Sequence, residues 1–140
     1  RLGEPASGLE FEDYDTLIGS NAVDHFTMLA GASIGFISGG AGTAMDTIVG
    51  GDSTNRWDVQ SSGTGRLNGT TRFSGFENIL GGLGDDHFNI MTGGSVSGLL
   101  DPREGVDTLD YSAFLVGLVV DFSLAQPTAR NISRVADNFE

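Results

Sequence analysis

The sequence predicts an all-β protein, and within that class a parallel β-solenoid (a β-helix or β-roll) of short strands and glycine-rich turns. Three observations lead to this prediction. The chain repeats itself at an offset of about 62 residues, short apolar pairs recur along it, and 22 glycines separate those pairs. A repeat at a steady period is typical of solenoids, in which each unit buries its apolar face against the next.

The internal repeat is clearest in two pairs of segments. Residues 14–19 recur as residues 76–81, and residues 24–27 recur as residues 86–89. If the chain is a solenoid, we expect equivalent residues to stack one rung above another. The matches divide the chain into a lead-in or cap over residues 1–10, a first unit over 11–72, a second unit over 73–134, and the start of a third unit over 135–140.

The expected strands of the first unit follow one another between turn signals. Each holds β-branched, aromatic or other apolar residues, which favour extended backbone, and glycines stand between most of them. These strands are residues 16–18, 26–29, 35–37, 47–49, 57–60 and 65–67.

The second unit has the same texture, and no stretch of the chain sustains a helical apolar stripe over three turns. Residues 111–124 are the best candidate for a helix, but residues 118–122 alternate and are better explained as a strand. The expected strands here are residues 78–80, 88–91, 96–100, 108–111, 118–122 and 131–133.

Composition limits the possible partners. The formal net charge is −12, there is no lysine and no cysteine, and all seven basic residues are arginine. Such an acidic surface repels nucleic acids and anionic membranes, which excludes nucleic-acid binding. No apolar run approaches the ~18 residues of a membrane span. The composition suits an exported protein, or one that collects cations.

One segment carries a recognisable motif. Residues 81–89 fit the nonapeptide G-G-x-G-x-D-x-U-x at every defined position, with Phe88 as the large apolar residue. The segment resembles the haemolysin-type, or RTX-like, calcium-binding repeat. Residues 76–82 and 107–113 are similar to the long repeats of very large secreted bacterial surface proteins and adhesins. The resemblance implies an extracellular or cell-surface location.

The resemblance also implies a calcium site. In the family, carbonyl groups of the glycine-rich turn and the Asp of a neighbouring turn form an all-oxygen cage, as calcium requires. Transferred to this chain, the ligands are Asp86 and the carbonyls of Gly82 and Gly84, with Asp24 or Asp107 on an adjacent rung. The alternative is that the glycines are kept for shape, while ordinary turn hydrogen bonds replace the ion.

Other candidate sites are less well supported. His25 and His87 occupy equivalent positions beside an aspartate, where a metal or catalytic pairing competes with a solvent-facing position copied by repetition. Trp57 has no aromatic counterpart in the second unit, so it is the aromatic residue to examine for contact with surface glycans. No paired acids, lysine or nucleophile motif indicates catalysis, so we expect no enzyme activity.

The sequence therefore predicts a structural segment of a secreted or surface protein. It would form a rigid arm or fibre by stacking head to tail with copies of itself or with neighbouring repeats, because exposed strand edges pair with other strands. The alternative is a calcium-binding module that folds on export, and a third possibility is a β-helix that binds or cleaves polysaccharide.

Overall fold

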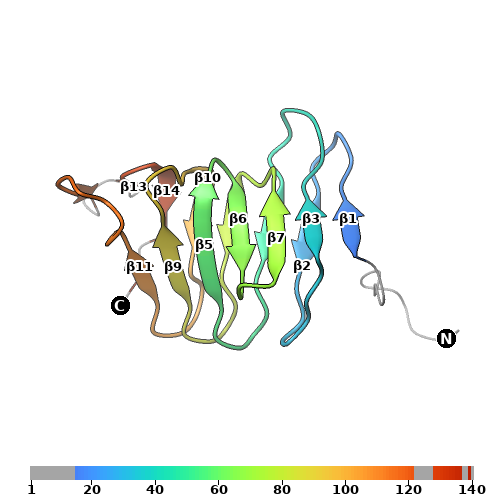
Figure 1. Cartoon of the computed structure of the whole chain (residues 1–140), viewed down its shortest axis with the longest axis horizontal. Coiled ribbons are helices and arrows are strands. Elements are labelled where there is room, and N and C mark those ends of the chain that lie inside the picture. The colour runs from blue at the N-terminus through green and yellow to red at the C-terminus, as the bar shows by residue number, and fades with distance from the viewer. Residues whose placement is uncertain (1–14, 122–127, 137–138, 140) are drawn as a thin grey trace, which may run out of the picture.

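The computed structural model describes residues 15–121, 128–136 and 139, and these residues form β-strands and turns without a helix. The strands make two seven-stranded sheets of mixed pairing (Figure 1). Sheet A has the order β1 (Thr16–Ile18), β3 (Phe36–Ser38), β7 (Thr71–Ser74), β6 (Thr64–Leu67), β5 (Arg56–Ser61), β9 (His87–Ile90) and β11 (Thr108–Asp110). Sheet B has the order β12 (Val120–Asp121), β13 (Thr128–Ala129), β14 (Ile132–Val135), β10 (Val96–Asp101), β8 (Asn78–Leu80), β4 (Thr47–Val49) and β2 (His25–Thr27). The prediction of an all-β protein is confirmed.

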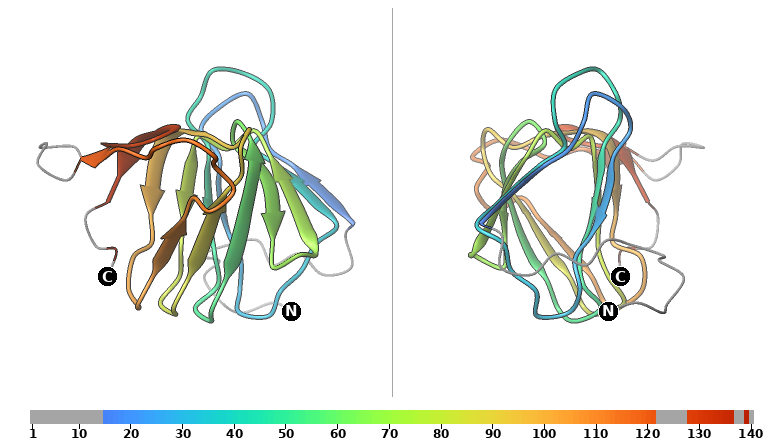
Figure 2. Two further views of the ribbon diagram at one scale, coloured as in Figure 1. Left: turned by 60° about the vertical axis from the view of Figure 1, so that its left-hand side comes forward. Right: turned by 90° about the vertical axis from the view of Figure 1, so that its right-hand side faces the viewer.

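The chain passes from one sheet to the other after most strands, so the two sheets face each other across a narrow interior (Figure 2). Strands that neighbour each other after one such circuit pair in parallel. Leu17 pairs with Ile37, and Phe88 pairs with Leu109, so paired residues are 20 to 21 positions apart at these places. This short spacing leaves no room for a helix between the strands.

Antiparallel pairing enters sheet A through an inserted meander. Strands β5, β6 and β7 follow one another in the same sheet, with Trp57 opposite Leu67 and Arg66 opposite Arg72. The insertion lengthens the circuit, because Trp57 pairs with Phe88 31 positions later. At the C-terminal end of sheet B, β12, β13 and β14 are also antiparallel.

Alternate residues of the strands point into the interior and form one apolar core. The largest fully buried side chains are Trp57, Phe73, Phe76 and Phe88. Trp57 stacks on Phe88 with ring centroids 6.0 Å apart and meets Phe73 edge-on at 5.6 Å. Such aromatic pairs add to the stabilisation that burial of their area provides.

The expected strands overlap observed strands, but the meander was not predicted. Strands β7 and β13 fall in segments where we expected no strand. The strand expected at residues 118–122 is shorter, since β12 comprises Val120–Asp121, and residue 122 lies outside the described residues. Thr71 and Phe73 both favour extended backbone, and pairing with β3 and β6 adds to that preference.

Repeat-equivalent strands do not stack on each other, contrary to expectation. Phe26 lies on β2 in sheet B, whereas its equivalent Phe88 lies on β9 in sheet A. Each pairs with a residue about one circuit away: Phe26 with Ile48, and Phe88 with Leu109. The division into units over 11–72 and 73–134 stays a prediction, and the expected lead-in over 1–10 lies outside the described residues. The described part of the chain contains no helix capable of crossing a membrane.

Candidate functional site

An acidic or amide side chain stands immediately before eight strands, and six of these side chains form two rows. The upper row precedes strands of sheet B and consists of Asp24, Asp46 and Glu77. The lower row precedes strands of sheet A and consists of Asn55, Asp86 and Asp107. The names refer to Figure 1, where the turns from sheet A to sheet B lie at the top and the turns from sheet B to sheet A lie at the bottom.

One hydrogen bond recurs along both rows. The carboxylate of each member accepts the backbone N–H of the preceding member in the neighbouring turn. In the upper row, Asp24 donates to Asp46 at 2.8 Å and Asp46 donates to Glu77 at 2.8 Å. In the lower row, Asn55 donates to Asp86 at 2.7 Å and Asp86 donates to Asp107 at 2.7 Å. The rows therefore fix the register between adjacent turns.

Asp86 is the best-connected carboxylate of the lower row. Its Oδ1 accepts hydrogen bonds from the backbone N–H and from Nδ2 of Asn55, and its Oδ2 accepts the backbone N–H of Gly82 at 2.7 Å. The residue is 1% exposed. Burial raises the pKa of the Asp86 carboxyl above its ordinary value, while the hydrogen bonds from Gly82 and Asn55 oppose that shift.

Gly82 and Gly84 allow the turns to pack directly on one another. A Cβ atom on Gly82 would lie 1.9 Å from the carbonyl oxygen of Gly51, and one on Gly84 would lie 2.8 Å from the backbone of Ser53. Real Cβ atoms do not approach backbone this closely, so only glycine fits the contact at Gly82. The turn at 81–86 thus rests on the turn at 50–55 through backbone contact.

Asp107 ends the lower row and differs from Asp86 in one respect. Asp107 is 1% exposed. Its Oδ2 is buried and has no hydrogen-bond partner among the described residues. The Gly82 equivalent four residues earlier is Arg103, whose N–H donates instead to Asp101. Burial and the negative charges of Asp86, Asp85 and Asp101 raise the pKa of the Asp107 carboxyl.

The structure does not bring Asp24 to the predicted calcium site. Asp24 belongs to the upper row, on the opposite edge of the molecule from Asp86 and Asp107, and its carboxylate accepts hydrogen bonds from Ser20. The two histidines are separated in the same way. His25 is on β2, while His87 is on β9 with Nε2 3.1 Å from Oδ2 of Asp110. The odd number of crossings between the repeated segments explains both separations.

The described residues do not fit a calcium cage around Asp86. Calcium takes six to eight oxygen ligands. Both carboxylate oxygens of Asp86 already accept hydrogen bonds from N–H groups, and the backbone of the turn at 50–55 packs directly against Gly82. Asp107 supplies one unpartnered oxygen. No group of three or more histidine or acidic side chains in the described part of the chain is arranged to hold a metal ion. The calcium site at Gly82, Gly84, Asp86 and Asp107 stays a prediction, and so does the alternative in which turn hydrogen bonds take the place of the ion.

Trp57 is not a surface residue. It is 0% exposed and packs in the centre of the core, so the expected glycan contact at Trp57 is wrong. The matching position of the second unit is Val120, which opens β12, the first strand of the antiparallel β12–β13–β14 group.

Sequence reasoning did not predict that three residues take part in the hydrogen bonds between neighbouring turns, namely Asp46, Asn55 and Glu77. A usable signal was present, because each directly precedes a strand, as Asp86 and Asp107 do. The position before the strand is therefore more informative than the complete nonapeptide.

Comparison with known proteins adds no further constraint. No protein-family model matches the chain, and no curated protein and no solved structure matches it. The arguments below therefore rest on the geometry of this chain.

The same substitution should have opposite effects at two positions of the lower row. In Asp86→Asn, the new NH₂ group faces the N–H of Gly82 or the N–H of Asn55, so we expect a loss of about 1–3 kcal/mol of unfolding free energy. In Asp107→Asn, the unpartnered oxygen becomes a donor that can reach the carbonyls of its own turn, as Nδ2 of Asn55 does. We expect this variant to gain up to about 1 kcal/mol. Urea unfolding at neutral pH measures both.

The pH dependence of stability provides the control. A carboxyl with a raised pKa in the folded chain binds more protons there than in the unfolded chain, so its contribution to stability grows as pH falls from neutral towards its ordinary pKa of 3.8. Asp107→Asn should flatten this rise. Hydrogen bonds from Ser112 and His87 lower the pKa of Asp110. Its contribution to stability is therefore complete above pH 3.8 and is lost as the pH falls below that value, opposite to the effect of Asp107. If Asp107→Asn is destabilised and the pH dependence of its unfolding free energy is unchanged, Oδ2 of Asp107 is not a buried oxygen without a hydrogen-bond partner.

Proposed function

We propose that this chain is a segment of a parallel β-solenoid with a structural role, forming a rigid arm or fibre of a secreted or cell-surface bacterial protein. The observation that carries the proposal is the pair of rows: the same hydrogen bond repeats from turn to turn, so one more turn can be added by repeating it. Parallel pairing at 20 to 22 positions supports it, as at Leu17–Ile37 and Phe26–Ile48. We propose no catalytic role.

The two ends of the described structure support growth by stacking. At one end, β1 and β2 are terminal strands, and Leu17 and Phe26 are half-buried where Ile37 and Ile48 one strand further in are buried. At the other end, β11 is the terminal strand of sheet A. A further circuit on either end would bury these side chains.

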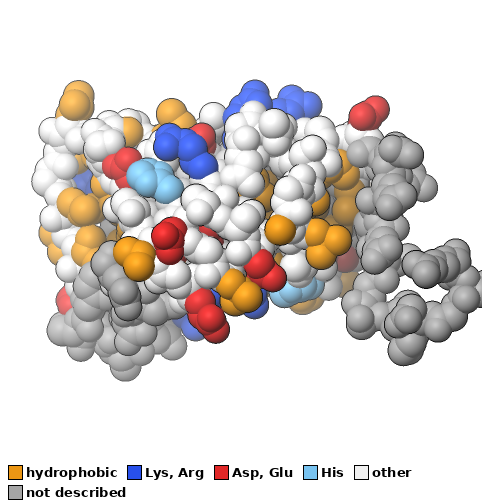
Figure 3. Space-filling view, turned by 90° about the horizontal axis from the view of Figure 1, so that it is seen from below, with side chains coloured by type: hydrophobic (Ala, Val, Ile, Leu, Met, Phe, Trp, Pro, Cys, Tyr) orange, Lys and Arg blue, Asp and Glu red, His pale blue; other side chains and the backbone are white. Residues whose placement is uncertain are grey.

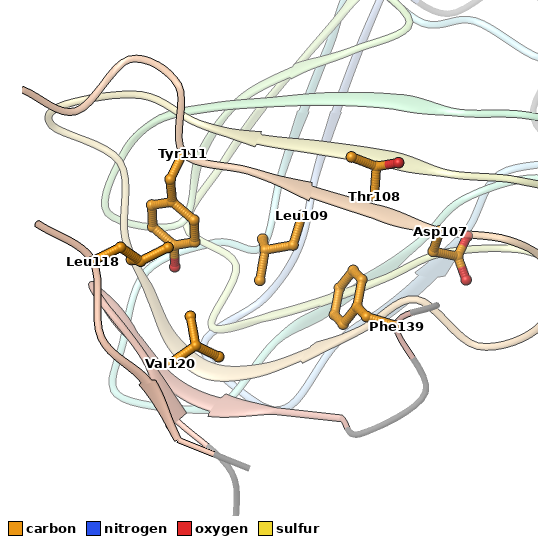
Figure 4. A pocket seen from close by; sticks show the side chains of 7 residues that line it. All are labelled: Asp107, Thr108, Leu109, Tyr111, Leu118, Val120 and Phe139. Carbon is orange, nitrogen blue, oxygen red and sulfur yellow. The ribbon is translucent and has the colours of Figure 1, made fainter.

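A hollow marks the C-terminal end of the core (Figure 4). It measures about 340 Å³ and is open at the end of the molecule, with Leu109 and Tyr111 on one side and Leu118, Val120 and Phe139 on the other. Asp107 and Thr108 complete its lining. An apolar hollow at an open strand edge suits a side chain from an added rung. Because the two ends differ, contact between them does not close and yields a filament.

Sedimentation velocity at rising concentration, with electron microscopy, tests the proposal. The carbonyl of Asp15 and the N–H of Gly19 form hydrogen bonds with strand β3. Because successive residues of a strand point their backbone groups to opposite sides, the N–H groups of Thr16 and Ile18 face away from β3. Ile18→Pro removes one of these N–H groups without breaking a hydrogen bond between β1 and β3. We expect association of the wild type in 0.5 M NaCl and about tenfold weaker association of Ile18→Pro. A wild type that stays monomeric at millimolar concentration would rule out end-to-end stacking.

A calcium-dependent module is the second candidate, favoured by the unpartnered oxygen of Asp107. Far-UV circular dichroism in EDTA, followed by calcium addition to several millimolar, separates the two functions. We expect the β spectrum in EDTA and a melting temperature that moves by less than about 2 °C, because a ligand stabilises only in proportion to its binding to the folded state. A chain that is disordered in EDTA and gains β signal with calcium would support the module instead.

A further inference from the structure

The outer face of sheet A carries a row of polar side chains that crosses five adjacent strands. Successive register partners place Arg72 beside Arg66, Arg66 beside Asp58, Asp58 beside Asn89, and Asn89 beside Asp110. Their strand neighbours, such as Trp57 and Phe73, are buried, so the row points outward. We call these five residues the charged row.

Among the described residues, no acidic side chain forms an ion pair with the positive half of the charged row. Like charges directly opposite on neighbouring strands destabilise a sheet, yet Arg66 and Arg72 are both exposed and face each other across β6 and β7. Arg66 reaches the carbonyl of Gly69 at 3.4 Å, and Arg72 lies 5.7 Å over the ring of Phe36.

The negative half lies on the other side of the row. Oδ1 of Asp58 meets Arg56 at 3.0 Å and Nδ2 of Asn89 at 2.9 Å, and Asp110 meets His87 at 3.1 Å. The row therefore runs from two cations through an anion and an amide to a second anion. If the row is reversed about the point midway between Arg66 and Asp58, a cation faces an anion at the two central positions.

We propose that sheet A binds sheet A of a second copy, face to face, through the charged row. A two-fold axis parallel to the strands, between β5 and β6, sets Arg66 of each copy against Asp58 of the other and Arg72 against Asn89, with Asp110 one strand further on. Such a contact is isologous and closes at two copies. It goes beyond the proposed end-to-end stacking, because it joins filaments side by side.

The electrostatics of the whole chain make this face the place of contact. At a net charge of −12, copies repel one another in most orientations. The arginines of sheet A are an exception: Figure 3 views the molecule from below, so that the front sheet of Figure 1 lies along the upper margin, and blue side chains cluster there. A polar, charged interface of this kind is salt-sensitive and weak to moderate in affinity.

The test uses the Ile18→Pro background, in which end-to-end stacking is suppressed, so that failure of the face-to-face contact and failure of the proposed function can be told apart. Sedimentation equilibrium in 50 mM NaCl should show a monomer–dimer equilibrium that stops at the dimer. Arg66→Glu breaks two equivalent contacts and should weaken dimerisation at least about tenfold. Arg134 is an exposed residue of β14 in sheet B, so Arg134→Glu makes the same charge change away from sheet A and should leave the dimerisation constant unchanged.

Charge reversal provides the decisive comparison. Asp58→Lys alone should weaken the dimer, whereas Arg66→Glu combined with Asp58→Lys restores opposite charges across the axis and should recover much of the affinity. Circular dichroism confirms that each variant is folded. A monomer at millimolar concentration in 50 mM NaCl, equal effects of Arg66→Glu and Arg134→Glu, or arginine-dependent binding of an acidic polysaccharide without a dimer would each overturn the proposal.

Discussion

Replacing Trp57 by alanine is expected to cost about 3–5 kcal/mol of unfolding free energy, enough to unfold a domain of ordinary stability. Trp57 is 0% exposed and stacks on Phe88 with an interplanar angle of 3°. Removal of its ring opens a cavity at the point where the inserted meander meets the parallel strands. Urea unfolding followed by circular dichroism measures the loss.

Trp57→Phe is the matched comparison. Phenylalanine keeps an aromatic ring against Phe88 and Phe73, and it removes the Trp57 Nε1–H, which is buried without a hydrogen-bond partner among the described residues. We therefore expect it to cost less than half as much as Trp57→Ala. Trp57 is the only tryptophan in the chain, so its fluorescence reports on this site alone. Red-shifted emission in the native wild type would contradict its burial.

The strand content of the fold could be predicted because apolar residues and glycine turns alternate at short intervals. The same pattern could not reveal the β5–β6–β7 meander. Its last strand, Thr71–Ser74, contributes one large apolar side chain, Phe73, and is extended because β3 and β6 flank it. Thr71 and Phe73 favour a strand locally, and pairing with β3 and β6 makes it the third strand of a meander.

The candidate site was predicted in part for a similar reason. Asp86 and Asp107 are 21 positions apart, one circuit of the chain, and the structure brings them into contact. Asp24 was included because it is equivalent to Asp86 in the repeat. Sequence similarity between the repeats copies local chemistry, an acid before a strand, while the number of sheet crossings decides on which edge that acid lies.

The glycines of the motif were predicted as ligands of a calcium cage, which stays a prediction. Their carbonyls were expected to face an ion. In the structure, the missing side chain is what matters, since the turn at 50–55 occupies the place of a Cβ at Gly82. The hydrogen bonds from Asn55 to Asp86 and from Asp86 to Asp107 hold neighbouring turns together.

Gly82→Ala should therefore destabilise the chain by about 3 kcal/mol or more, whether or not calcium is present. Its Cβ would lie 1.9 Å from the oxygen of Gly51, a backbone atom that cannot turn aside, so the two turns must separate. Separation of the turns also strains the hydrogen bonds from Asn55 to Asp86. Gly117→Ala is the control, because a Cβ there meets nothing within 4 Å, and it should change stability by less than about 0.5 kcal/mol. Thermal unfolding in EDTA and in calcium measures both variants. If calcium rescued Gly82→Ala, or if the variant lost stability only in calcium, the turn would be acting through an ion and not through direct packing.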